Sequence, residues 1–154
     1  MEFTFNRRWL MTPAGMFTSR SHFIFKEEKE MVYLLVGLSG TLGAILRYLI
    51  GISFFTHSSF PYATLAINLI GSFLLAWLTT RFFKKVSWPS HITTAIGTGF
   101  VGSFTTFSTL SVETVQLFQA GDRMLGVLYV LVSMIGGLLM SRLGFNLGKE
   151  EPKS

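Results

Sequence analysis

The chain contains no cysteine, and only 14% of its 154 residues carry a charge. The absence of cysteine excludes disulfide bonds and thiolate metal ligands. The low charge argues against a soluble domain, in which roughly 25% of residues are charged. The three histidines are scattered and lack the spacing of a metal site. Neither a facing pair of carboxylates nor a Ser/His/Asp arrangement is recognised, so we do not expect an enzyme.

Hydrophobic residues make up 49% of the chain, which also contains 16 Phe and 15 Gly. This composition is typical of membrane proteins, which use aromatic belts and close helix contacts. A helix needs about 20 apolar residues to cross a bilayer. Short connections separate the apolar segments and favour antiparallel neighbours. The sequence therefore predicts an all-α membrane protein with four transmembrane helices, at about residues 32–55, 62–83, 92–110 and 124–143.

These helices form one domain over residues 31–148, followed by a polar tail over 149–154. In residues 1–30 no continuous apolar core follows the basic start, so a signal peptide is not expected. This extension is either an amphipathic or disordered segment or a misassigned start. We favour a misassigned start, because the residues KEEKE use only purine codons, as a ribosome-binding site just before Met31 would.

The net charge of +5 comes from basic residues that flank the apolar segments. Basic residues at the ends of apolar segments keep the neighbouring loops in the cytoplasm. We therefore expect the chain to lie in membrane lipid and not to bind nucleic acid. With both termini inside, Arg47 and Arg123 lie on the outer side. The inner side holds six cations, namely Arg81, Lys84, Lys85, Arg142, Lys149 and Lys153. This asymmetry predicts a fixed orientation.

The third segment combines glycines with a run of hydroxyl side chains, Thr105-Thr106-Phe107-Ser108-Thr109. Both features weaken a helix, and broken backbone at membrane depth is tolerated only inside protein or beside water. The segment therefore predicts a broken helix at a transport site. Thr106 and Ser108 offer donors to an anion, and the edge of the Phe107 ring is partly positive. The alternative is an unbroken helix whose hydroxyls bond back to carbonyls at i−4.

Other polar residues lie singly on the remaining segments. Arg47 either attracts anions into a vestibule or snorkels to the interface. Asn68, which shares a face with Thr64, either forms an interhelical hydrogen bond or donates to a dehydrated anion. Tyr129 and Ser133 add donors at i and i+4. No carboxylate lies in the central part of any predicted helix, which favours an anion over a cation as the ligand.

Three motifs, one in each of the first three helices, stand in a fixed order. They are Gly40-x-x-Gly43-Ala44-x-x-Arg47-Tyr48, Thr64-Leu65-x-x-Asn68-x-x-Gly71-Ser72-Phe73, and Gly99-x-x-Gly102-x-x-Thr105-Thr106-Phe107-Ser108-Thr109 with Glu113 following. Over about residues 31–147 the chain resembles the Fluc/CrcB fluoride channels. The resemblance implies a fluoride-specific channel of the bacterial plasma membrane that exports fluoride passively and reduces its toxicity. It also implies an antiparallel, dual-topology-type dimer with two pores.

The resemblance assigns roles to particular residues. Asn68 donates to fluoride, Phe107 lines the pore with its ring edge, and Arg47 matches the vestibule arginine. Polar pore positions are matched by Thr64, Tyr129 and Ser133. The backbone carbonyls of Gly102 and Thr105 match those that bind one structural Na⁺, which is not transported.

Two departures bear on the partner. Leu110 stands where the family usually has a second pore phenylalanine, and Ala76 replaces a common glycine. Together with the charge asymmetry, Leu110 leaves open a homodimer or a heterodimer with an oppositely oriented paralogue. Two other functions remain as alternatives: a small four-helix multidrug exporter, and a non-conducting scaffold subunit of the membrane. The exporter would have a glutamate in its first helix, where this chain has only Arg47.

Overall fold

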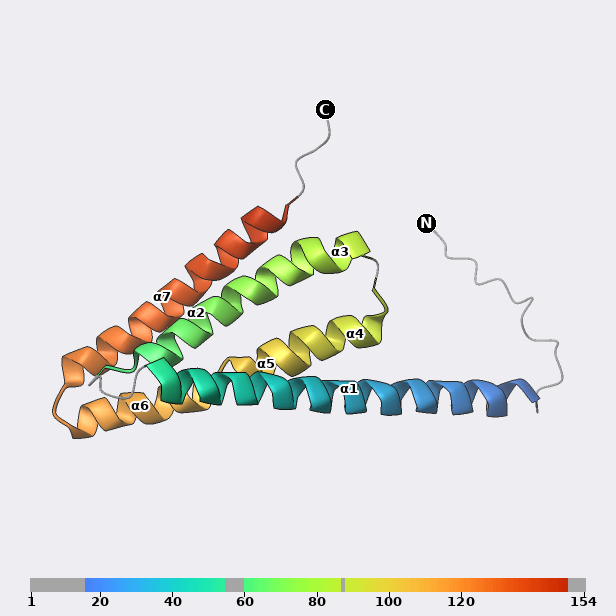
Figure 1. Ribbon diagram of the computed structural model, residues 1–154, viewed down its shortest axis with the longest axis horizontal. Helices are drawn as coiled ribbons and strands as arrows, with labels where there is room; N and C mark the ends of the chain where they lie inside the picture. The colour runs from blue at the N-terminus through green and yellow to red at the C-terminus, as the bar shows by residue number, and fades with distance from the viewer. Residues whose placement is uncertain (1–15, 55–59, 87, 150–154) are drawn as a thin grey trace, which may run out of the picture.

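The computed structural model describes residues 16–54, 60–86 and 88–149, and within these every regular element is a helix, with no strand. Two long helices dominate the view in Figure 1, α1 (Met16–Phe54) and α7 (Arg123–Gly148). Residues 1–15 lie outside the described residues, and the side chains of residues 16–28 are not described either. The predictions for the N-terminal extension therefore stay predictions.

The second predicted segment forms α2 (Tyr62–Trp77), a π-helical stretch η2 (Leu78–Phe82) and a short α3 (Phe83–Val86). Pro61 precedes α2, where its missing N–H costs no helical hydrogen bond. α2 and α7 lie side by side (Figure 1). A Cβ on Gly144 of α7 would meet the carbonyl oxygen of Phe73 on α2. Small residues thus bring the two backbones into direct contact, as membrane helices require.

The third predicted segment is divided among four elements. α4 (Ser90–Thr94) leads into the π-helical η3 (Ala95–Val101) and then into α5 (Gly102–Phe104). Thr105 (φ −76°, ψ 157°) and Thr106 (φ −149°, ψ 122°) are extended, and α6 (Phe107–Gln119) follows. The extended residues lie inside the segment for which the sequence predicted a break.

Among the described residues, three helices are long and apolar enough to cross a membrane, Lys29–Ser53, Tyr62–Val86 and Arg123–Gly148. The segment predicted over 92–110 is not among them, because its helices are individually too short. The predicted boundaries were also too narrow. The third segment continues to Gln119, and α7 continues five residues past the predicted 143 to Gly148. The helices extend past the apolar residues from which the sequence predicted their bounds.

α1 packs along η3 and α5 through small residues. A Cβ on Gly43 would meet the carbonyl oxygen of Phe100. One turn earlier, the Ser39 hydroxyl donates to the carbonyl oxygen of Ala95 at 2.6 Å. These contacts hold the first part of the divided segment against α1. At the other end, Gly121 (φ +89°) makes the tight turn between α6 and α7, in a conformation that favours glycine.

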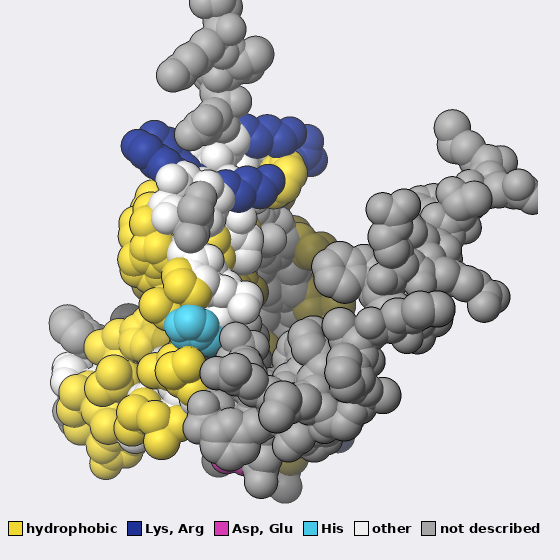
Figure 2. All heavy atoms as spheres, turned by 90° about the vertical axis from the view of Figure 1, so that its right-hand side faces the viewer, with side chains coloured by type: hydrophobic (Ala, Val, Ile, Leu, Met, Phe, Trp, Pro, Cys, Tyr) yellow, Lys and Arg dark blue, Asp and Glu magenta, His cyan; other side chains and the backbone are white. Residues whose placement is uncertain are grey.

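The buried core is small and lies where α2, the divided segment and α7 meet. Its most buried apolar side chains include Ile67, Val101 and Phe104, and Tyr129 is fully buried. Large apolar side chains elsewhere are mostly exposed, as on α7, where Leu138 is 73% exposed. Figure 2 shows apolar side chains over the body, with Lys and Arg gathered at one end. Exposed apolar helices with charge at their ends define a multi-pass membrane protein.

Candidate functional site

The interruption between α5 and α6 is held by one side chain from α2. The Asn68 Nδ2 donates to the carbonyl oxygen of Thr106 at 2.9 Å, and the Thr106 N–H donates to Asn68 Oδ1 at 2.8 Å. The Asn68 carboxamide thereby pairs with both the N–H and the carbonyl of Thr106, a residue that has left the helix. Because an NH₂ group carries two hydrogens, Asn68 keeps a second donor. From the sequence, an interhelical hydrogen bond and donation to an anion were alternative roles of Asn68. The geometry makes the two roles compatible.

The hydroxyls of the two threonines behave differently. Thr105 Oγ1 donates back to the carbonyl oxygen of Val101 at 3.1 Å, as the unbroken-helix interpretation expects. Thr106 instead caps α6: its hydroxyl accepts from the Thr109 N–H at 3.2 Å. It also lies 3.2 Å from the Ser108 hydroxyl and 2.9 Å from that of Thr109. The start of α6 is thus a cluster of three hydroxyls.

Phe107, the first residue of α6, is 80% exposed. It borders a cavity of about 280 Å³ between α2, α5 and the start of α6. Asn68 and Leu110 line the same cavity, and so do Gly102 and Thr105. Of the residues predicted to meet fluoride, Asn68, Thr106 and Phe107 thus lie at the same cavity as the two predicted to hold Na⁺, whereas Thr64, Ser108, Tyr129 and Ser133 do not line it. Leu110 faces this cavity at the position where an aromatic ring was expected.

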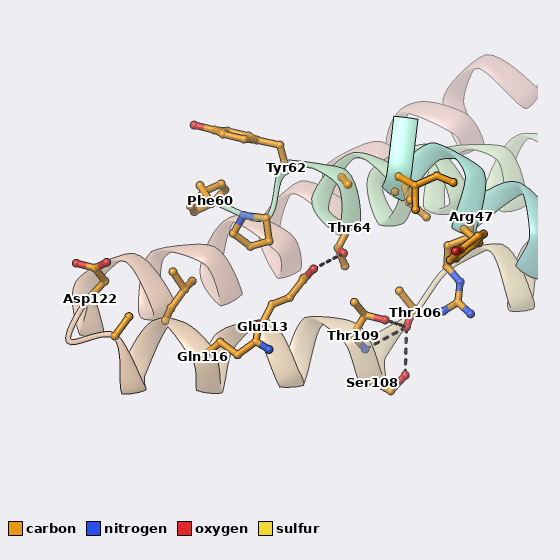
Figure 3. A pocket seen from close by; sticks show the side chains of 18 residues that line it. Arg47, Phe60, Tyr62, Thr64, Thr106, Ser108, Thr109, Glu113, Gln116 and Asp122 are labelled. Carbon is orange, nitrogen blue, oxygen red and sulfur yellow. Dashed lines mark hydrogen bonds between the residues drawn. The ribbon is translucent and has the colours of Figure 1, made fainter. Parts of the chain in front are cut away.

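A second cluster, which the sequence did not predict, centres on Glu113 of α6. Its two carboxylate oxygens accept hydrogen bonds from Thr64 Oγ1 at 2.9 Å and from the Tyr129 hydroxyl at 2.7 Å. Figure 3 shows the Glu113 side chain reaching from α6 toward Thr64 of α2. The carboxylate thus links three helices. We name these three residues the Glu113 triad.

Sequence reasoning missed the triad because it ended the third segment at residue 110 and so placed Glu113 beyond the helix bundle. The available signal was the position of Glu113 six residues after Phe107, on a segment that continued to Gln119. The hydroxyl hydrogens of Thr64 and Tyr129 go to the carboxylate. The sequence predicted hydrogen-bond donors inside the bundle and no carboxylate to accept from them. That prediction is wrong at the end of the bundle where Glu113 lies.

The triad opens onto a cavity of about 820 Å³ at one end of the molecule. Arg47 lines it from α1, and Thr106 and Ser108 line it from the interruption (Figure 3). The Glu113 and Asp122 side chains also border it. The cavity therefore carries both signs of charge, with the arginine placed beside the hydroxyl cluster.

Ser133, the remaining predicted site residue, lies one turn from Tyr129 on α7. Its side chain is 9% exposed, and its hydroxyl has no hydrogen-bond partner among the described residues. A buried hydroxyl without a partner is destabilising by roughly 1–3 kcal/mol. Ser133 thus stands apart from the triad as an unsatisfied buried polar group.

The described residues contain no group of three or more His, Cys, Asp or Glu side chains that could hold a metal ion. The cation ligands predicted from the sequence are the backbone carbonyls of Gly102 and Thr105. Thr105 suits this role, because its extended conformation turns its carbonyl out of the helical hydrogen-bonding pattern. Outside its own helix and among the described residues, the Gly102 carbonyl accepts one long hydrogen bond, from Thr105 Oγ1 at 3.4 Å.

The fold and the site define a multi-pass α-helical membrane protein with an interrupted helix surrounded by hydrogen-bond donors. A family model described as CrcB-like protein, Camphor Resistance (CrcB), matches residues 34–145. The chain belongs to this family.

Three bacterial relatives are similar to this chain in sequence. "Fluoride-specific ion channel FluC 1" of Desulfitobacterium hafniense is 70% identical over 112 residues, covering 73% of this chain and 98% of the relative. A FluC 1 of Bacillus cereus is 54% identical over 127 residues, covering 81% and 88%. "Fluoride-specific ion channel FluC 2" of Geobacillus kaustophilus is 46% identical over 125 residues, covering 80% and 97%.

Proposed function

We propose that this chain forms a fluoride-specific channel that lets fluoride leave the bacterial cytoplasm passively. The observation that carries the proposal is the Asn68–Thr106 pair, which holds an interrupted helix open beside an exposed aromatic ring. The names of the relatives support it. Fluoride enters a cell as neutral HF and ionises inside, so a passive pore is sufficient for the anion to leave.

The chemistry required of the pore is replacement of the water around a small anion. Asn68 supplies its second N–H, and Thr106 and Ser108 supply hydroxyls within the same stretch of chain. The Phe107 ring supplies a partly positive edge. Ser133, whose buried hydroxyl lacks a partner, supplies a further donor. Together these groups bind an anion weakly at several points, which favours passage over retention.

The triad has a different role in this proposal. Thr64 and Tyr129 hold the Glu113 carboxylate by both of its oxygens, so their hydroxyl hydrogens point away from the anion. They fix α2 and α7 against α6 next to the hydroxyl cluster. Arg47, which lines the same cavity, offsets the negative charge and draws anions to this mouth.

The carbonyls of Gly102 and Thr105 are proposed to bind a structural Na⁺. Both residues line the cavity beside Asn68, and no acidic side chain lines that cavity with them. The equivalent pair from a second subunit would bring the number of oxygens to four. A bound cation there raises the local potential for an anion.

A second subunit is also proposed to close the pore. Phe107, which lines the smaller cavity, is 80% exposed, and apolar side chains of α1 and α7 are widely exposed. Antiparallel pairing would cover these faces. The partner is either a second copy or an oppositely oriented paralogue. Relatives named FluC 1 and FluC 2 are consistent with paired genes, and the charge asymmetry of this chain favours the paralogue.

The proposal is tested by fluoride efflux from liposomes, read with a fluoride electrode. We expect purified protein, alone or co-expressed with its paralogue, to release fluoride while chloride is retained. Release by the chain alone would show that Leu110 is tolerated in a homodimer. Release only with the paralogue would show an obligate heterodimer. No release in either form would contradict the proposed function and leave the scaffold alternative.

A further inference from the structure

We infer that Arg142 recruits fluoride at the mouth of the pore opposite Arg47, so that the permeation path carries an arginine at each end. The inference rests on the proposed function and assigns a role to a residue that neither the motifs nor the triad includes. Arg142 lies in the last two turns of α7, at the end of the molecule away from the Glu113 triad.

Three cavities in the described part of the chain are linked by lining residues that they share. The cavity of about 820 Å³ beside Arg47 shares Thr106 with the cavity of about 280 Å³ beside Phe107. The second cavity shares Ser72 and Leu75 with a third of about 850 Å³. The third lies between α2–η2 and α7, and Arg142 lines it. These shared residues make the three cavities a series of neighbours from Arg47 to Arg142, which we name the furrow.

The furrow keeps hydroxyl groups along its second half. Ser72 and Thr79 are seven residues apart on α2–η2, which places them on one face about 10 Å from each other. Their hydroxyls donate to the carbonyl oxygens of Asn68 at 2.8 Å and Leu75 at 2.8 Å. Such local bonds are exchangeable, so an anion in the furrow can replace them. Ser141, next to Arg142, lines the same stretch from α7.

Arg142 differs from the other cations at this end, which Figure 2 shows gathered together. Arg81 donates to the carbonyl oxygen of Leu147 at 3.4 Å, and the Lys149 ammonium lies 4.7 Å from the centre of the Phe145 ring. Neither these two nor Lys84 and Lys85 line the furrow. Among these described cations, Arg142 is therefore the one that lines the furrow.

The distribution of acidic groups supports the same role. In the stretch of chain with described side chains, the carboxylates are Glu30, Glu113 and Asp122, and none forms an ion pair with Arg142. Glu113 and Asp122 border the opposite cavity. A guanidinium is permanently charged and more weakly hydrated than an ammonium. At the mouth of a cleft with apolar walls such a charge raises the local concentration of anions.

The test measures the initial rate of efflux against the fluoride concentration, in whichever assembly of this chain conducts. We expect Arg142→Gln to raise the half-saturating fluoride concentration on the order of tenfold, with a smaller change in the maximal rate. Arg142→Lys should restore most of the loss. Added impermeant salt should slow the wild type more than Arg142→Gln, because only the wild type has this charge to screen.

Lys85→Gln is the matched control, since it removes one positive charge from the same end but not from the furrow. A role of Arg142 in membrane orientation alone would make both variants behave alike. Equal half-saturation in Arg142→Gln and Lys85→Gln, with a conducting wild type, would overturn the inference and leave the proposed function intact. Arg142→Met keeps the long side chain and serves if the glutamine variant does not fold. If no assembly of the wild type conducts, both the function and the inference fail.

Discussion

At the scale of single residues, Asn68 is the side chain on which the site depends most. Its carboxamide matches the two hydrogen-bonding groups of Thr106, which have left the helical pattern. A buried polar group that loses its partner costs roughly 1–3 kcal/mol. The residue therefore joins the stability of the interruption to the donor that an anion needs.

Asn68→Asp is expected to abolish fluoride conduction. A carboxylate still accepts from the Thr106 N–H, but it cannot donate to the Thr106 carbonyl, and its charge repels the anion. Liposome efflux measures the result. Gln119→Glu, at an exposed position on α6 that lines none of the three cavities, makes the same change from carboxamide to carboxylate and should conduct like the wild type. Near-normal efflux in Asn68→Asp would count against the donor role.

Tyr129→Phe is expected to destabilise the protein by about 1.5–3 kcal/mol, because one oxygen of the Glu113 carboxylate loses its hydrogen bond. Thermal unfolding in detergent measures the change. Tyr33→Phe, at a position that is 70% exposed, is the control and should leave the unfolding midpoint unchanged. If both variants unfold at the same temperature, the triad contributes little to the fold.

At the scale of elements, contacts between helices decide where the divided segment lies. Sequence reasoning found the segment by its glycines and hydroxyls, and the extended residues Thr105 and Thr106 lie within it. It did not foresee the π-helical stretches or the continuation to Gln119. Neither is found by a search for helical periodicity, because the π-helical stretches span only five and seven residues and α6 is only partly apolar.

Gly43→Ala is expected to destabilise the packing of α1 on η3 by about 1–3 kcal/mol, because the new methyl group meets the backbone carbonyl of Phe100. Gly37→Ala on the same helix is the control. Nothing lies within 4 Å of its new methyl group, so helix propensity makes it neutral or slightly stabilising. The unfolding midpoints of the two variants give the comparison. Equal midpoints would show that α1 shifts freely on its neighbour.

At the scale of the whole molecule, the distribution of charge separates the two ends. The cations of η2, α3 and the end of α7 lie together at one end, while Arg47 and the triad lie at the other. Positive charge of this kind retains its end of a membrane protein in the cytoplasm. The exposed apolar faces of α1 and α7 leave room for a partner of either orientation.

A single orientation is expected when the chain is expressed in cells. The absence of native cysteine makes the test direct, since a cysteine introduced at Lys149 or at the exposed Ala120 is the only reactive thiol. Membrane-impermeant maleimide added outside should label Ala120→Cys and spare Lys149→Cys. Labelling of both to similar extents would show insertion in both directions, as a dual-topology homodimer requires.

The sequence by itself determined the class of protein, the approximate extent of three of the four predicted spans, and the region of the third segment in which the chain is extended. These depend on local composition, which acts within a few turns of the chain. Only the tertiary structure decided that Asn68 meets Thr106, that Glu113 joins Thr64 and Tyr129, and that Arg142 lines the furrow. Those contacts join residues far apart in sequence, and they depend on how each helix is rotated against its neighbours. Helical periodicity shows which residues share a face, but packing against other helices decides what that face meets.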